Sequence, residues 1–117
     1  MTERENKTDL GIVKIKDEAI SSIADLAALE VKGVAATRPD FMTRVLKPMN
    51  KRGVKVDIKE NDIKITVFIV TEYGANIPMV ANQVQEDVKR SVEKMTGISN
   101  VEVNVNVQGV SSPPKGM

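Results

Sequence analysis

The sequence contains no cysteine and no histidine among its 117 residues. Without cysteine there is no disulfide framework, no thiolate nucleophile and no cysteine-ligated zinc or iron–sulfur site. Without histidine, the commonest neutral-pH general base and the commonest imidazole metal ligand are also missing. These two absences exclude Ser-His-Asp and Cys-His catalysis and zinc-finger sites. Any chemistry would depend on Asp, Glu, Lys, Ser, Thr or the single Tyr.

Aromatic residues, net charge and long apolar runs are scarce as well. One Tyr and two Phe leave few rings to stack on bases, and 17 Lys and Arg against 16 Asp and Glu give a net charge of +1. Because nucleic-acid backbones are bound by a basic excess, a nucleic acid is not expected as a dedicated partner. No apolar run approaches the ~20 residues that span a bilayer, and the charged N-terminus is not that of a signal peptide. We therefore expect a cytoplasmic protein with no membrane span.

The remaining composition is that of one soluble globular domain. At 41% apolar and 28% charged residues, the chain has enough Val, Ile, Leu and Ala to bury a core. The polar residues 1–9 and the Pro- and Ser-containing residues 111–117 are expected to be flexible tails. Residues 10–110 are expected to form a single domain.

Hydrophobic periodicity predicts the elements of that domain. Alternating apolar residues predict strands at 11–15, 54–58, 63–70 and 101–107. Apolar stripes at helical spacing predict one helix capped by Asp17 and ended by Gly33, and a longer one capped by Asn76 and closed by Gly97. The order β-α-β-β-α-β predicts an α+β two-layer sandwich, with two helices packed on one face of a mainly antiparallel sheet.

The segment between the first helix and the second strand contains a short apolar pattern with a basic rim. Phe41, Met42, Val45, Leu46 and Met49 follow Pro39 at the spacing of one helical face. Five cations without an intervening acid follow on the same segment: Arg44, Lys47, Lys51, Arg52 and Lys55. One interpretation is a surface that binds a partner or an anionic membrane. The other is a connector that packs its Leu and Met onto the domain and leaves its charges in solvent.

A second candidate surface lies on the face of the sheet that turns away from the helices. If Ile65 and Val67 face the core, strand alternation directs Phe68 and Val70 to the opposite, otherwise polar face. There they would form an apolar patch suited to self-association or docking. The alternative is that a tail or loop covers them.

No motif for catalysis, cofactor binding or metal binding is present. The carboxylates Glu86, Asp87 and Glu93 lie among Lys and Arg at helical spacing, which is typical of a solvated face. Neither GxGxxG nor GxxxxGK[ST] occurs, and no acidic cluster has the spacing of a calcium loop. We expect no catalytic residue, no cofactor and no metal.

Several short stretches occur in an order that is more specific than any one of them: GIVKI at 11–15, IADLA at 23–27, EVKGV at 30–34, GVKV at 53–56, EYGANIP at 72–78, MTG at 95–97 and VEVNV at 101–105. In this combination the chain resembles the alkaline shock protein family, the envelope stress response family of Gram-positive bacteria, over residues 10–110. One departure is the segment 35–49, which is commonly glycine-rich in the family and is not so here.

The resemblance implies a non-enzymatic cytoplasmic protein of cell-envelope homeostasis or stress. Such proteins are often held at the inner face of the membrane by a membrane-anchored partner, and some members self-assemble. We therefore expect a homo-oligomer that docks on a membrane-anchored protein, with Phe41, Met42, Leu46, Phe68 and Val70 as candidate contacts. The alternative function is a weak nucleic-acid or anionic-lipid binding module that uses the basic segment 44–55.

Overall fold

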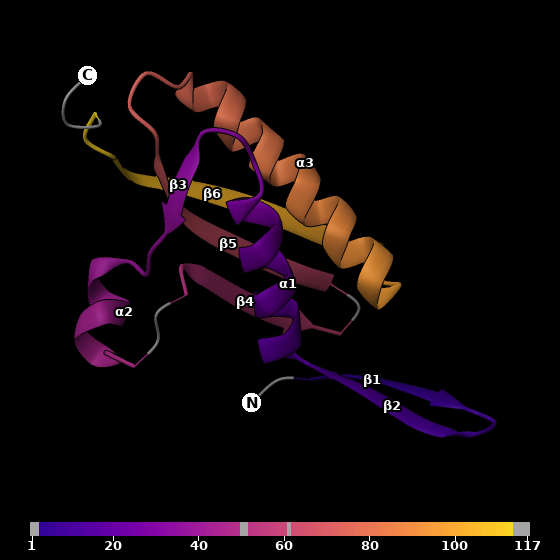
Figure 1. Cartoon of the computed structure of the whole chain (residues 1–117). Helices are drawn as coiled ribbons and strands as arrows, with labels where there is room; N and C mark the ends of the chain where they lie inside the picture. The colour runs from indigo at the N-terminus through magenta and orange to yellow at the C-terminus, as the bar shows by residue number, and fades with distance from the viewer. Residues whose placement is uncertain (1–2, 50–51, 61, 114–117) are drawn as a thin grey trace.

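The main sheet is built around one long central strand. The computed structural model describes residues 3–49, 52–60 and 62–113 (Figure 1). Strand β5 (Asp62–Thr71) pairs antiparallel with β4 (Val54–Lys59) and then with β3 (Val34–Thr37), both on the same side. On its other side β5 pairs parallel with β6 (Val101–Val110). The expected α+β fold with a mainly antiparallel sheet is confirmed.

Two helices cover one face of this sheet, as expected (Figure 1). Helix α1 (Asp17–Leu29) buries mainly alanines, which allows a close approach to the sheet and to α3. Helix α3 (Ile77–Thr96) buries a stripe of valines at helical spacing. The side chains with no exposed surface at the centre of this core are Ile20, Ala24, Ala28, Ile65, Val67, Ile69, Val84, Val88 and Val92.

The ends of α3 follow the predicted capping, whereas the start of α1 does not. The Asn76 side chain accepts a hydrogen bond from the Met79 backbone N–H at 3.2 Å, and Gly97 ends the helix in the left-handed conformation with φ 74°. Asp17 is not the N-cap of α1. Lys16 occupies that position without a side-chain hydrogen bond, and Asp17 is the first helical residue.

The N-terminal residues differ from the expectation of a flexible tail. Strand β1 (Glu3–Thr8) pairs antiparallel with β2 (Gly11–Lys16) in a two-stranded sheet of their own. The predicted strand at 11–15 therefore forms, but its partner is β1 and not the main sheet. The hairpin extends away from the domain at the start of α1 (Figure 1). At its tip the Thr8 hydroxyl donates to the Gly11 carbonyl and accepts from the Leu10 N–H.

Strand β3 was not predicted. It pairs with the end of β5, and the segment after residue 37 therefore starts at this side of the sheet. The strand has four residues, and the Thr37 hydroxyl at its end donates a hydrogen bond to the Asp25 carboxylate on α1. After β6, the Ser111 N–H donates to the Thr71 carbonyl at 2.8 Å. Residues 114–117 lie outside the described part of the chain, so the C-terminal tail stays a prediction.

Candidate functional site

The candidate site is the connector of residues 38–53, which leaves the sheet and returns to it at one residue of β5. The Arg38 N–H donates to the Phe68 carbonyl at 3.0 Å, and the Phe68 N–H donates to the Gly53 carbonyl at 2.7 Å. Phe68 therefore bridges the gap between β3 and β4 along the side of β5. A loop with its two ends held together in this way is a compact surface unit of the kind that often carries function.

The two ends of the connector meet so closely that one of them has to be glycine. A Cβ atom at Gly53 would lie 2.3 Å from the Arg38 nitrogen and 2.6 Å from the Phe68 oxygen. Both atoms belong to the backbone and cannot rotate away. Gly53 therefore permits the chain crossing from which the connector projects.

Helix α2 (Phe41–Leu46) lies within this connector and begins at an N-cap aspartate. The Asp40 carboxylate accepts a hydrogen bond from the Thr43 N–H at 3.0 Å. The same carboxylate lies 3.4 Å from the Lys55 ammonium of β4, and that ammonium lies 5.5 Å from the centre of the Phe68 ring. A series of contacts thus links the start of α2 to the outward face of the sheet.

Helix α2 exposes its apolar side chains and packs little against other elements. It has no buried residue and stands apart from α1 and α3 at one end of the sheet (Figure 1). Its four large apolar side chains are 58–70% exposed. They are Phe41, Met42, Val45 and Leu46, and the nearby Met49 is more exposed still. The interpretation in which the connector packs Leu46 and Met49 onto the domain is wrong.

Phe68 and Val70 do not form the exposed patch that alternation suggested. Phe68 lies outside the core beneath the helices, yet only 5% of its surface is exposed, and Val70 is half-buried. The expected exposure of Phe68 is therefore wrong. The Lys55 ammonium lies over the Phe68 ring and covers that part of the outward face. The Arg38 guanidinium lies near Gly109 of β6, 3.7 Å from the position that a Cβ would take.

The five predicted cations have different surroundings. Arg44 and Lys47 are exposed and have no ionic partner among the residues that the structure describes. Lys55 is held by Asp40 and Phe68, and Arg52 is half-buried and makes an interaction of its own. Lys51 lies outside the described residues. Among the described members of the predicted basic cluster, the freely exposed positive charge is therefore that of Arg44 and Lys47.

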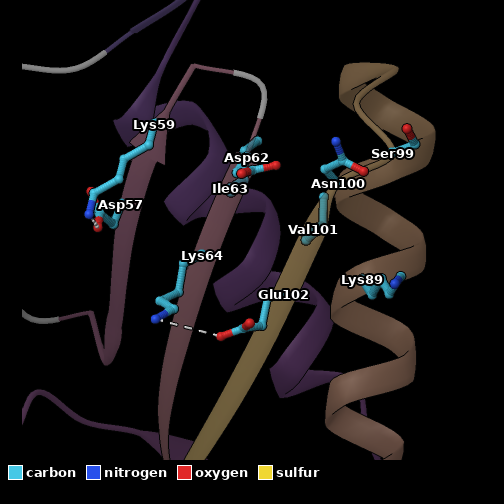
Figure 2. A pocket seen from close by; sticks show the side chains of 10 residues that line it. All are labelled: Asp57, Lys59, Asp62, Ile63, Lys64, Lys89, Ser99, Asn100, Val101 and Glu102. Carbon is cyan, nitrogen blue, oxygen red and sulfur yellow. Dashed lines mark ion pairs between the residues drawn. The ribbon is translucent and has the colours of Figure 1, made fainter.

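The remaining outward face of the sheet is polar and internally paired. The Lys64 ammonium lies 3.8 Å from the Glu102 carboxylate, which also accepts a hydrogen bond from the Asn104 amide at 3.0 Å. A shallow hollow of about 530 Å³ lies beside this pair. Its side chains come mainly from β4, β5, β6 and α3, and Figure 2 shows them spread apart, with Asp57 and Lys59 on one side and Lys89 on the other. They do not converge on a reacting point.

The described residues form neither a metal-binding cluster nor a membrane-spanning helix. Among residues 3–49, 52–60 and 62–113, no group of three or more acidic side chains is placed to hold a metal ion. In the same part of the chain, no helix is both long and apolar enough to cross a membrane.

The Asp40 contacts lead to a prediction about pH. Hydrogen bonds from the Thr43 hydroxyl and backbone hold the pKa of Asp40 below its ordinary value of 3.8, and the Lys55 charge adds to this. Since the folded-state pKa is the lower one, the ionised carboxylate stabilises the native connector above the unfolded-state pKa of about 3.9. This stabilisation is lost as the pH falls through the folded-state pKa.

We therefore expect carboxyl-carbon NMR to show Asp40 titrating below the ordinary range, with the Thr43 amide proton shifting at the same midpoint. In Asp40→Asn the Thr43 amide shift should no longer follow pH. A midpoint at or above the ordinary value, or a Thr43 shift that is unchanged by Asp40→Asn, would rule out the capping contact in solution.

Sequence reasoning missed the crossing of Gly53 over Arg38 and the pairing of β1 with β2. A glycine just before a strand was visible, but nothing local revealed which backbone would approach it. The β1 residues are charged and polar, a composition that favours a tail over a strand. Their pairing depends on the neighbouring β2 and the two-residue turn between them.

Comparison with known proteins supplies the family. A family model for the alkaline shock protein 23 family, described as having a cell envelope-related function, matches residues 5–112. An uncharacterised protein of Bacillus subtilis, YqhY, is 40% identical over 112 residues, covering 92% of this chain and 83% of that protein. A stress response regulator gls24 homolog of Streptococcus pyogenes is 26% identical over 107 residues, covering 87% of this chain and 60% of that protein.

A solved structure supports the fold alone. The zinc form of a MamM C-terminal domain variant matches with a TM-score of 0.52 at 17% identity, covering 86% of this chain and 92% of that one. The family description names no catalytic activity. Since the family model spans nearly the whole chain and YqhY is 40% identical to it, this chain belongs to the alkaline shock protein 23 family, whose function is related to the cell envelope.

Proposed function

We propose that this protein acts by binding and not by catalysis. In this proposal it works in the cytoplasm, self-associates, and docks through α2 onto a membrane-anchored protein partner as part of cell-envelope homeostasis. The family's cell envelope-related function and the stress response regulators among its relatives support the setting. The hollow beside Lys64 and Glu102, with its dispersed and paired charges, offers no arrangement for a reaction.

The single observation that carries the proposal is the exposed apolar surface of α2. Four large apolar side chains on six residues stand in solvent, although burying each of them would be worth about 1.5–3 kcal/mol. The contacts of Asp40 with Thr43 and Lys55 hold the helix in place. A clustered apolar surface on an anchored loop is typical of a protein-binding site.

A protein partner is favoured over a purely electrostatic one. In the predicted basic segment 44–55, the described exposed cations without an ionic partner are Arg44 and Lys47, and a cation near an anionic surface contributes about 1 kcal/mol. Two such contributions give weak, salt-sensitive attraction. Burial of the apolar side chains of α2 would contribute several times more binding free energy. Binding to anionic lipid or nucleic acid through residues 44–55 is therefore the alternative that the binding experiments have to distinguish.

The test compares two variants for binding to inside-out membrane vesicles from the native host. Phe41→Asp/Leu46→Asp should reduce co-sedimentation with the vesicles at least about tenfold, because it removes apolar contact at the docking surface. Met95→Asp is the matched control, since Met95 is equally exposed but lies on the last turn of α3. It should bind as the wild type does. Equal binding by all three proteins would contradict docking through α2.

A further inference from the structure

The β1–β2 hairpin is a projecting element without a sheet to join. Strand β2 contacts α1, whereas β1 pairs with β2 alone, and its other edge carries no strand among the described residues. Ile12 and Val13 on β2 are each more than half exposed. Isolated two-stranded hairpins are only marginally stable in water, and a third strand or a packed face is normally needed. The open edge of β1 is thus a place where a further strand would add stability.

The register of the hairpin determines which main-chain groups face that edge. Thr8 and Gly11 flank the two-residue turn and form a pair. In an antiparallel hairpin of this type, alternate residues direct both main-chain groups at the partner strand. Lys7 and Glu5 lie one and three residues before Thr8, at the positions that do not bond to β2, and direct their main-chain groups outward. Both side chains are exposed. Any strand that adds to β1 will hydrogen-bond to these two residues and lie beside their charges.

We propose that the added strand is β1 of a second copy, paired antiparallel about a two-fold axis so that Glu5 of each copy lies opposite Lys7 of the other. This rests on the proposed function, because it specifies the surface used for self-association. An isologous two-fold contact repeats each cross-strand pair twice. One attractive Glu–Lys pair therefore becomes two.

Charge selects this register over its neighbours. A shift of two residues in one direction places Glu5 opposite Glu5, with Glu3 opposite Lys7 on either side of that pair, and a shift in the other direction places Lys7 opposite Lys7. Within Glu3–Thr8, the proposed register is the one that has Glu–Lys pairs and no like-charge pair. Like charges directly opposite one another destabilise a strand pair, whereas opposite charges stabilise it. Charged edges normally prevent strands from pairing indiscriminately. Here Glu5 and Lys7 disfavour pairing with most other strands. They attract a second copy of β1 in the proposed register, which makes the contact specific.

Lys14 extends the same charge pattern across the hairpin. Its ammonium lies 3.9 Å from the Glu5 carboxylate within one chain. In the dimer Glu5 would stand between Lys14 of its own chain and Lys7 of the second copy. Six residues of strand bury little area, so the dimer is expected to be weak, with dissociation in the micromolar range or above.

The proposal is tested by charge reversal and complementation in the full-length protein, measured by sedimentation velocity over a hundredfold concentration range. Glu5→Lys opposes Lys with Lys twice, and Lys7→Glu opposes Glu with Glu twice. Each variant alone should raise the dimer dissociation constant at least about tenfold. An equimolar mixture restores two Glu–Lys pairs across the interface and should form a heterodimer more tightly than either variant dimerises alone, although the Glu5–Lys14 pair is lost in one copy. Each variant should keep the thermal midpoint of the main domain.

Three results would overturn the inference. If both variants self-associate like the wild type, or if their mixture remains monomeric, β1 does not pair in this register. In the first case the proposed self-association stands and uses another surface. A wild-type protein that is monomeric throughout overturns both this inference and the self-association in the proposed function. Phe41→Asp/Leu46→Asp is the control, and it should dimerise normally because α2 lies far from the hairpin (Figure 1).

Discussion

Val67→Asp is expected to abolish cooperative folding. Val67 lies on β5, has no exposed surface and packs in the core beneath the two helices. A carboxylate placed there has no ionic partner in the core, so the change costs several kcal/mol for the buried charge and about 2 kcal/mol for the lost apolar contact. A domain of this size has about 5–15 kcal/mol of stability in total. Urea titration followed by circular dichroism should show no cooperative transition.

Phe68→Asp is the informative comparison, because Phe68 follows Val67 on β5 and faces the opposite side of the sheet. The ring is buried, and the new carboxylate would stand beside the Lys55 ammonium. We expect this variant to fold with a loss of about 2–4 kcal/mol, since ring burial is lost and part of the charge is compensated. Thr66→Asp on the same face should change stability by less than about 1 kcal/mol. Equal loss in Val67→Asp and Phe68→Asp would mean that the assignment of strand faces is wrong.

Gly53→Ala is expected to destabilise the protein strongly although it lies outside the helix-covered core. The added Cβ would lie 2.3 Å from the Arg38 nitrogen, so one of the two backbones must move. That movement strains the hydrogen bonds that join Phe68 to Arg38 and to Gly53. We expect a loss of about 2–4 kcal/mol in the free energy of unfolding, together with altered NMR shifts throughout α2.

Gly74→Ala provides the control for this substitution. Gly74 has φ +91° but nothing within 4 Å of an added Cβ, so the expected cost is conformational strain of about 1 kcal/mol. The shifts of α2 should not change. If Gly53→Ala is no more destabilising than Gly74→Ala, the connector does not cross itself as closely as described.

Most of the main domain was predictable because its signals are local. The valine stripe of α3, its Asn76 cap and its Gly97 terminus act within a few residues of one another. Strands β5 and β6 alternate over ten residues each, and such a pattern reports which face is buried. These elements also determine the two-layer arrangement, since each must bury one face.

The unpredicted parts depend on partners that are distant in sequence. Alternation identified the strand at 11–15 but did not specify its neighbour, and β1 supplied one. Strand β3 has two alanines in four residues, too short and too small a pattern to detect.

For the candidate site, helical spacing predicted α2 and its apolar residues but not their exposure. An amphipathic pattern shows that residues share a face and leaves open what covers that face. The same limit applied to Phe68. Alternation gave its side of the sheet correctly, whereas its burial depends on Lys55 and the crossing at Gly53. Both are tertiary features.

The most direct test of docking on a membrane-anchored protein is co-sedimentation with three kinds of vesicle. These are native inside-out membranes, the same membranes after protease digestion of their exposed proteins, and protein-free anionic liposomes. We predict binding to native membranes that persists at high salt and is lost after digestion, with little binding to liposomes, because apolar contact resists screening. Salt-sensitive binding that is equal on digested membranes and liposomes would contradict the account and favour anionic lipid recognition by the 44–55 segment.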